Sequence, residues 1–246
     1  MSGLKGRVAL VTGGSRGLGK GIVSALAEKG IHVIINYSRN KKDARETVEQ
    51  IRARDLSAVA IQGDVSKWEQ AKDLITNAVN EWGRIDYLIN NVGDFIHKAI
   101  ENISVNDWNN MINSNLNSSF YCCKAVLPFM RKQNFGRIIN IGLANAGIKA
   151  YKNVMPYAIA KTGVHILTKS LAVSEAEHGI TINVVAPGLM DNGSMSDEEI
   201  YEQSHTVPMQ RVGTADDLAG AVLYLLSDEA KYVTGTEIIV SGGWGL

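Results

Sequence analysis

Short apolar runs alternate along the chain with segments whose apolar residues recur at helical spacing. Residues 7–12 form the first apolar run, and a glycine cluster ends it. In residues 17–30 the apolar side chains recur three and four positions apart, up to a glycine at the expected helix end. A strand followed by an amphipathic helix, repeated many times, is typical of a parallel sheet that helices cover on both faces.

This periodicity extends over the whole chain and predicts about seven strands. Predicted strands occupy residues 7–12, 32–37, 58–65, 85–91, 136–142, 181–187 and 236–243, and predicted helices residues 17–30, 41–54, 67–82, 105–132, 157–178 and 215–227. We expect one domain, residues 1–246, with a Rossmann-type doubly wound α/β fold. The only long irregular piece in the pattern is residues 188–213, with a small helix at 196–204, and a connection of that length is usually a lid or binding loop.

Composition and charge remove several classes of function. Lys and Arg together number 25, as do Asp and Glu, so no net charge attracts nucleic acid or an anionic membrane. No apolar run reaches the roughly 18 residues of a membrane span, and the N-terminus lacks a signal-peptide pattern. The two cysteines, Cys122 and Cys123, are adjacent and cannot form a long cross-link. We therefore expect a cytoplasmic protein that binds neither nucleic acid nor membrane.

A glycine-rich turn follows the first predicted strand. The sequence TGGSRGLG places Gly13, Gly17 and Gly19 where a chain turns tightly, approaches a ligand and packs a new helix on the sheet. The N-terminus of that helix offers backbone N–H groups to a phosphate. Although the spacing differs from G-x-G-x-x-G, the position between strand and helix predicts a pyrophosphate site; the alternative is a tight turn without a ligand.

The end of the second predicted strand bears on which nicotinamide cofactor binds. An acid there would bind the adenosine ribose hydroxyls and repel a 2′-phosphate. Tyr37, Ser38 and Arg39 occupy this corner, and Arg16 of the glycine turn can reach it. Hydroxyl and guanidinium groups suit a phosphate, so NADP(H) is favoured over NAD(H). Asp64, after the third predicted strand, either accepts from the adenine amino group or caps the next helix.

Seven motifs together resemble the classical short-chain dehydrogenase/reductase family over nearly the whole chain. In order they are TGGSRGLG, GDV, NNVG, INSNL, YAIAK, APG and YVTGTEIIVSGG. Within the family the chain looks most like the bacterial 3-oxoacyl-(acyl carrier protein) reductases. The resemblance implies an NADP-dependent oxidoreductase that transfers a hydride to a carbonyl (a 3-oxoacyl thioester or a ketone) or to a related conjugated substrate.

The resemblance also implies a set of cofactor-binding residues and a homotetramer. The apolar C-terminus, with Trp244 and Leu246, fits burial against a neighbouring subunit. The residues that would contact NADP(H) are Gly13, Ser15, Arg16, Gly17, Leu18, Gly19, Ser38, Arg39, Asp64, Val65, Asn91, Gly93, Tyr157, Lys161, Pro187 and Gly188.

Carbonyl reduction needs a hydride from the cofactor and a proton for the developing alkoxide, so the protein must supply a general acid. Tyr157 is the candidate acid. Lys161 lies one helical turn away on the same face, where its ammonium group favours phenolate. By resemblance, Lys161 also binds the nicotinamide ribose, and Asn115 holds a water that relays protons from the lysine to solvent.

The substrate-oxygen donor of the family is missing. A serine follows the equivalent of Gly142 in the family, and here that position is Leu143. Removing one oxyanion donor typically lowers turnover by about 100- to 1000-fold. Three interpretations remain open: Asn145 supplies the donor, or the substrate is a conjugated enone, imine or pterin-like ring packed by Leu143, or the protein binds NADP(H) with little chemistry and has a regulatory role.

The remaining polar residues suggest neither a metal site nor strong docking of acyl carrier protein. The five histidines have no metal-ligand spacing, although His97 and His205 lie near the expected substrate pocket. Arg131 and Lys132 offer positive charge, but the lid carries several acids. A small free carbonyl or a coenzyme A thioester is therefore favoured as substrate. Met190, Met195 and Met209 of the lid either line an apolar, adaptable pocket or pack the lid itself.

Overall fold

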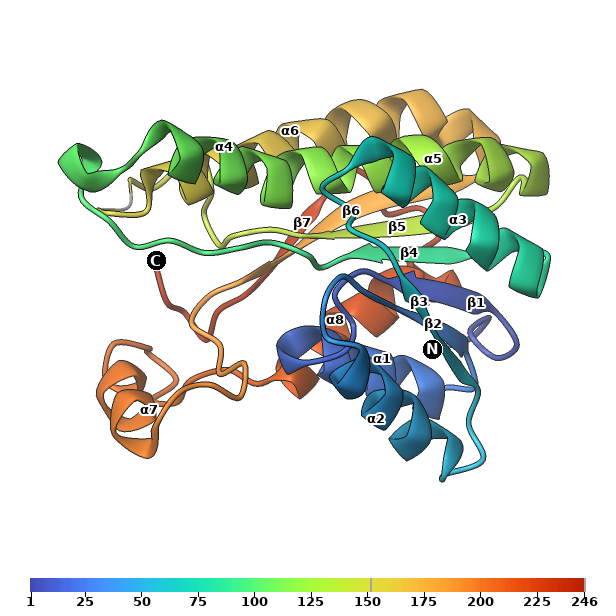
Figure 1. The fold of residues 1–246 in the computed structure, drawn as a ribbon, viewed down its shortest axis with the longest axis horizontal. Coiled ribbons are helices and arrows are strands. Elements are labelled where there is room, and N and C mark those ends of the chain that lie inside the picture. Colours follow the sequence, from blue (N-terminus) through green and yellow to red (C-terminus); the bar gives the residue numbers. More distant parts are fainter. Residues whose placement is uncertain (151, 246) are drawn as a thin grey trace.

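A seven-stranded parallel sheet lies between two layers of helices in the computed structural model, which describes residues 1–150 and 152–245 (Figure 1). The strand order is β3-β2-β1-β4-β5-β6-β7, so the chain winds outward in both directions from β1 and β4. The strands are β1 (Val8–Val11), β2 (His32–Tyr37), β3 (Ala58–Gln62), β4 (Tyr87–Asn90), β5 (Gly136–Ile141), β6 (Ile180–Pro187) and β7 (Glu237–Val240). The predicted doubly wound α/β fold is confirmed.

Two groups of helices cover the two faces of the sheet (Figure 1). One face carries α1 (Gly17–Glu28), α2 (Lys41–Arg52) and α8 (Ala215–Leu226), and the other carries α3 (Trp68–Trp82), α4 (Val105–Ile112), α5 (Ser118–Gln133) and α6 (Met155–Glu175). Successive strand residues point to opposite faces, so Leu10 packs in one apolar core and Val11 in the other. Each fully buried side chain of this size stabilises the fold by roughly 1.5–3 kcal/mol.

Several predicted boundaries are wrong by a few residues. The strand predicted at 58–65 ends at Gln62, and the one predicted at 236–243 is confined to Glu237–Val240 because Gly242 and Gly243 have positive φ and turn the chain. The helix predicted at 157–178 begins at Met155, where Pro156 fits the first turn, and it ends at Glu175. A 3-10 turn, Ala176–His178, follows it.

The segment predicted to hold long helices, residues 105–132, contains α4 and α5 joined by a π-helical turn, Asn113–Asn117. Isolated π turns are rare and occur frequently at functional sites. The apolar periodicity did not predict the π-helical turn, because such a turn adds only about one residue to a helical turn and leaves the apolar pattern almost unchanged.

Residues 188–213 are not the only long irregular piece, which corrects the expectation above. The stretch after β4 has only one 3-10 turn, Ile100–Asn102, before α4, and residues 142–154, after β5, have no helix or strand outside the undescribed Tyr151. Both stretches leave the carboxyl ends of central strands. The 188–213 segment contains α7 (Asp197–Ser204), and its two ends meet at a bridge between Met190 and Gly213. No described helix has the length and apolarity to cross a membrane.

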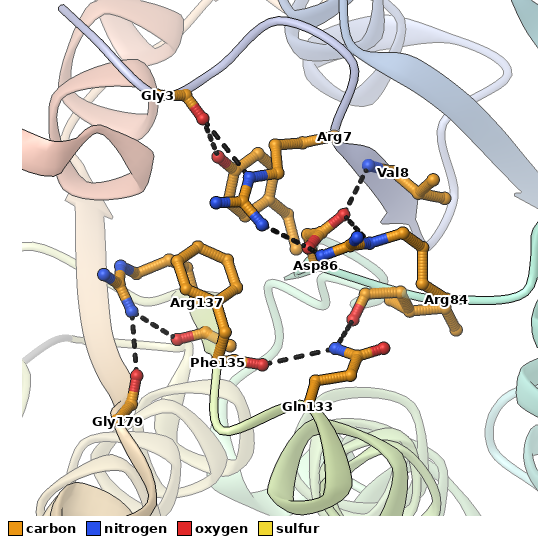
Figure 2. Close-up of polar contacts among 12 residues, drawn as sticks. Gly3, Arg7, Val8, Arg84, Asp86, Gln133, Phe135, Arg137 and Gly179 are labelled. Carbon is orange, nitrogen blue, oxygen red and sulfur yellow. Dashed lines mark hydrogen bonds and ion pairs between the residues drawn. The ribbon is translucent and has the colours of Figure 1, made fainter.

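A charged cluster fixes the amino ends of the central strands, opposite the expected site (Figure 2). The buried Asp86 carboxylate accepts from Arg7 at 3.0 Å, from Arg84 Nε at 2.9 Å and from the Val8 backbone at 2.9 Å. Arg137 donates to two backbone carbonyls, and its guanidinium lies 4.5 Å from the centre of the Phe135 ring. The Asp86 bonds connect β1 with the residues before β4, and the Arg137 bonds connect β5 with the turn before β6, where no ligand is expected.

Candidate active site

The glycine-rich turn opens directly into α1. Gly13 and Gly17 have φ values of 61° and 55°, which other residues rarely adopt. A Cβ at Gly19 would overlap the Gly13 carbonyl and lie 2.6 Å from the Asn91 side chain. Arg16, the residue before α1, makes no side-chain cap, so its side chain leaves the first N–H groups of the helix to another acceptor. A phosphate group fits this arrangement.

Asn91 holds the glycine-rich turn rather than pointing away from it. Its Nδ2 donates to the Thr12 carbonyl at 3.0 Å and to the Gly13 carbonyl at 3.2 Å. The Thr12 hydroxyl in return accepts from the backbone N–H groups of Asn91 and Val92. The predicted cofactor residues after β1 and β4 therefore form one hydrogen-bonded unit.

The corner after β2 carries exposed polar residues and no carboxylate among residues 37–39. Ser38 and Arg39 are exposed, as is Arg16 in the neighbouring turn. Asn40 then caps α2 by accepting from the Asp43 backbone at 3.2 Å. The guanidinium groups of Arg16 and Arg39 thus lie exposed to solvent at this corner, and among the described residues no acid forms an ion pair with either.

Asp64 and Val65 follow β3, which ends at Gln62 and not at Val65. The Asp64 carboxylate accepts from the hydroxyl and the backbone N–H of Ser66, at 2.6 and 3.1 Å. The residue before α3 is Lys67, which makes no side-chain cap. The alternative that Asp64 caps this helix is therefore wrong, because its carboxylate closes a local turn. Val65 is buried in the core beneath it.

Asn115 lies in the π-helical turn and its side chain is fully buried. Its amide nitrogen donates to the backbone carbonyls of Asp94 and Met111, at 2.9 and 3.1 Å. Its Oδ1 is buried, and no donor among the described residues forms a hydrogen bond to it. A Cβ at Gly93 would overlap this oxygen and lie 3.3 Å from Nζ of Lys161, so the two groups border the same small space. An acceptor with no protein donor fits a bound water.

Lys161 and Tyr157 share one face of α6, at the carboxyl end of β5. The Lys161 ammonium group is buried and donates to the Ile141 carbonyl at 2.8 Å. Burial lowers the pKa of Lys161 from 10.5 to about 8. Its Nζ lies 5.7 Å from the centre of the Tyr157 ring. The phenol and the ammonium group are therefore neighbours, as their spacing predicted.

Two residues beside this pair were not found from the sequence. Phe95 is largely exposed, and its ring meets the Tyr157 ring edge-on with centroids 5.2 Å apart. His165, one turn beyond Lys161, is buried, and burial followed by the charge of Lys161 lowers its pKa from 6.5 to about 4. The four-residue spacing of Tyr157, Lys161 and His165 was the signal that could have revealed the histidine.

Leu143 and Asn145 begin the irregular stretch after β5. Leu143 is buried, and the adjacent Ala144 backbone donates to the Pro187 carbonyl at 3.1 Å. Asn145 has a positive φ of 59°, and its side-chain amide donates to the Gly245 carbonyl at 3.2 Å. The amide that was a candidate substrate donor is therefore already engaged with the C-terminal segment.

Pro187 is the last residue of β6, and Gly188 follows it beside the C-terminal residues 241–245. The Gly188 backbone donates to the Val240 carbonyl at 3.0 Å. A Cβ at Gly188 would lie 3.3 Å from Cε3 of Trp244, so the indole packs directly on this turn. Trp244 is half-buried by its own chain. Leu246, which was expected to pack with it against a neighbour, lies outside the described residues.

The structure also describes the candidate metal-ligating, substrate-contacting and carrier-binding side chains. Among the described residues no three His, Cys, Asp or Glu side chains are placed to hold a metal ion. His205 is bonded to the Tyr201 carbonyl at 2.7 Å, and His97 is exposed. Arg131 is paired with the buried Glu175 at 2.6 Å, which leaves it less available to a carrier protein.

A cavity of about 630 Å³ lies between the 188–213 segment and β7. Met190 and Met209 of the lid line it, together with Ile239 and Gly242. Its lining does not include Tyr157 or Lys161. It is therefore not the space directly in front of the candidate acid.

Comparisons with known proteins agree with this geometry. The family model described as enoyl-(acyl carrier protein) reductase matches residues 13–245. The 3-oxoacyl-(acyl-carrier-protein) reductase FabG of Staphylococcus epidermidis is 37% identical over 238 residues, covering 96% of this chain and 97% of its own. Glucose 1-dehydrogenase 2 of Bacillus subtilis is 34% identical over 249 residues, covering 99% and 96%.

Solved structures place the chain in the same group. A putative short-chain alcohol dehydrogenase from Sinorhizobium meliloti has a TM-score of 0.91 at 32% identity and covers 98% of this chain and 96% of its own. A short-chain dehydrogenase/reductase variant from Serratia marcescens has a TM-score of 0.91 at 30% identity over 99% of both chains. The chain belongs to the short-chain dehydrogenase/reductase family of oxidoreductases.

Proposed function

We propose that the protein is an NADPH-dependent reductase of a ketone, a 3-oxoacyl thioester or a related conjugated substrate. One observation carries the proposal: Tyr157, Lys161 and the unpartnered oxygen of Asn115 converge where β4 and β5 end. The carboxyl ends of strands in such a sheet are where ligands bind. A chain that had lost its chemistry would have no physical need for this combination.

The nucleotide fits the residues of this chain. The uncapped N-terminus of α1 and the turn held by Asn91 provide backbone donors for a pyrophosphate. Arg16 and Arg39, exposed at the corner after β2, would bind a 2′-phosphate with charge-assisted hydrogen bonds. Several 3-oxoacyl reductase relatives share more than a third of their residues with this chain, which supports the same choice of reaction class.

A bound nicotinamide supplies the hydride. Tyr157 donates its phenolic proton to the oxygen or nitrogen atom on which negative charge develops. Lys161, held by the Ile141 carbonyl, stabilises the phenolate that remains. The Asn115 oxygen binds the water that returns a proton through Lys161 to the phenolate. Each step uses a group that is held before substrate arrives.

Leu143 favours a conjugated or apolar carbonyl over a substrate that needs a second oxygen donor. The Leu143 side chain is 8% exposed and donates no hydrogen bond. Asn145 would have to break its bond to Gly245 to replace the missing serine. Phe95 adds a second apolar surface against the Tyr157 ring. A flat conjugated substrate gains from such surfaces and depends less on an oxyanion donor.

We also propose a cytoplasmic homotetramer with the 188–213 segment as a substrate lid. The outer surfaces of α5 and α6 expose Phe120, Ile159, Ile166 and Val173, with 40% to 84% of each side chain accessible. Apolar groups at such positions favour burial against another subunit. The lid proposal rests on the length of this segment and on the bridge at its base.

The test is NADPH oxidation, followed by loss of nicotinamide absorbance, with a panel of simple ketones, quinones, enones, a pterin and acetoacetyl-CoA. We expect turnover of at least one panel member and its loss in Tyr157→Phe. NADH should be at least about tenfold poorer, and Arg16→Ala should remove most of that preference, since a charge-assisted bond contributes roughly 1.5–3 kcal/mol. If the natural chain and Tyr157→Phe both bind NADPH tightly and neither reduces any member of the panel, the result would support the alternative of an NADP(H)-binding regulatory protein.

A further inference from the structure

Residues 241–245 contact three parts of the molecule that surround the candidate site. These parts are the loop after β5 (residues 143–149), the turn after β6 (residues 187–188) and the 188–213 segment. The C-terminal segment, Ser241 to Gly245, begins where β7 ends and runs between them. In Figure 1 the chain ends beyond the carboxyl end of the sheet, on the side where α7 also lies.

Two glycines let the segment turn against the 188–213 segment. Gly242 and Gly243 have φ values of 60° and 86°. The Gly242 carbonyl accepts from the Met209 backbone at 3.1 Å. A Cβ at Gly243 would lie 3.0 Å from the Pro208 ring, and one at Gly242 would lie 2.9 Å from Val207. A side chain at either position would therefore force the neighbouring residue of the 188–213 segment to move.

The next two residues reach the loop after β5. The Gly245 carbonyl accepts from the Asn145 amide at 3.2 Å. The Lys149 ammonium group lies 5.5 Å from the centre of the Trp244 ring, in the range of a cation–π contact. The same indole packs on Gly188. One aromatic side chain therefore touches both the loop that carries Leu143 and the turn expected at the nicotinamide.

The conformation of Asn145 depends on this contact. Its φ of 59° lies in the left-handed region, which carries a backbone cost that asparagine bears more easily than most residues other than glycine. The bond to Gly245 offsets part of that cost, and Leu143 lies only two residues away. A shift of Asn145 would therefore move the apolar side chain that stands in place of the missing donor.

We propose that Trp244 and the Gly245 carbonyl are positioning groups that hold residues 143–149 and couple them to the 207–209 part of the lid. This inference rests on the proposed function, because the pocket that it shapes is the one in front of Tyr157. In this role Asn145 is the anchor of the loop and does not act as a substrate donor. The C-terminal segment thereby affects substrate affinity more than nucleotide affinity, because, of the predicted nucleotide contacts, only the turn at Gly188 touches it, and the others lie mainly after β1, β2, β3 and β4.

The test compares Trp244→Ala, Trp244→Phe and Asn145→Asp with the natural chain. Asp keeps the size of Asn and tolerates a positive φ, but its ionised carboxylate cannot donate to Gly245. We expect Trp244→Ala and Asn145→Asp to raise KM for the best substrate by about tenfold or more, since small displacements of positioning groups have large effects. The Kd for NADPH should change by less than about twofold, and Trp244→Phe should restore KM to within about threefold.

Hydrogen exchange supplies a readout that does not need turnover. Trp244→Ala should speed exchange in residues 143–149 and 205–210, with the central strands unchanged. The matched control is Trp82→Phe, because Trp82 stacks on His32 at the amino end of β2, far from this site. It should alter neither KM nor exchange in these two segments.

The results separate this inference from the proposed function. A natural chain without reductase activity would refute the proposed function, yet exchange would still test the coupling. Unchanged exchange in both segments after Trp244→Ala would overturn the inference. So would faster exchange throughout the sheet with an equal loss of NADPH affinity, because that pattern shows a general structural role.

Discussion

Lys161 donates from its buried ammonium group to the backbone carbonyl of Ile141, 2.8 Å away. The bond connects α6, on the face that carries Tyr157, with the end of β5, which leads to Leu143. The bond fixes the position of the ammonium group. A single carbonyl, however, does not compensate for the loss of hydration that burial causes. The pKa of Lys161 therefore falls to about 8.

The first prediction concerns the pH dependence of kcat/KM, which reports ionisations of the free enzyme. Since Lys161 is protonated below about pH 8 and loses its charge above it, kcat/KM should fall by about tenfold per pH unit above this value. Lys169→Gln, two turns further along α6 at an exposed position, should leave the profile in place. A profile that is flat to pH 10 would contradict the assigned role of the Lys161 charge.

The second prediction concerns stability. Because the folded-state pKa of Lys161 is lower than that of the unfolded chain, the unfolded chain binds more protons between pH 8 and 10.5, and stability should rise with pH in that window. Lys161→Met should abolish reductase activity and yet raise the free energy of unfolding at pH 7 by on the order of 2 kcal/mol. Urea denaturation at pH 7 and pH 10 measures this gain, which should shrink at the higher pH. A less stable variant at pH 7 would show that burial of the charge is not the dominant cost.

The third prediction concerns the space between Asn115 and Lys161. A Cβ in Gly93→Ala would overlap the Asn115 oxygen and would approach Nζ to 3.3 Å, which leaves no room for the proposed water. We expect kcat to fall by about 100-fold, the lower end of what general acid–base catalysis contributes. Gly220→Ala is the matched control, because a Cβ there meets no atom within 4 Å and the position lies inside α8. Equal kcat in both variants would remove the water relay from the mechanism.

The fourth prediction concerns the amino ends of the strands. Asp86 is fully buried and neutralises Arg7 and Arg84, so Asp86→Asn leaves positive charge without its acid (Figure 2). The free energy of unfolding should fall by about 3 kcal/mol or more. Glu46→Gln removes the exposed partner of Lys42 and should change it by less than about 1 kcal/mol. Equal losses in the two variants would show that burial of the Asp86 charge has no special weight.

The sequence predicted the strands and the face of α6 that carries Tyr157 and Lys161, because both depend on a regular period. Phe95 could not be found this way, since its contact with Tyr157 joins an irregular stretch to a helix that begins 60 residues later in the chain. The engagement of Asn145 was hidden for a related reason: its partner, Gly245, lies 100 residues further along the chain. The apolar periodicity and the motifs assign residues to particular helices, strands and turns. Contacts between loops far apart in the sequence depend on the tertiary structure.

The central claim, that a site without the family serine is a working reductase site, is tested by steady-state NADPH oxidation in the natural chain, Leu143→Ser and Tyr157→Phe. The account predicts that the natural chain reduces a conjugated or apolar carbonyl, that Tyr157→Phe abolishes this activity, and that Leu143→Ser does not raise it. Activity that appears only in Leu143→Ser would contradict the account, because it would show that the natural site is an impaired catalyst.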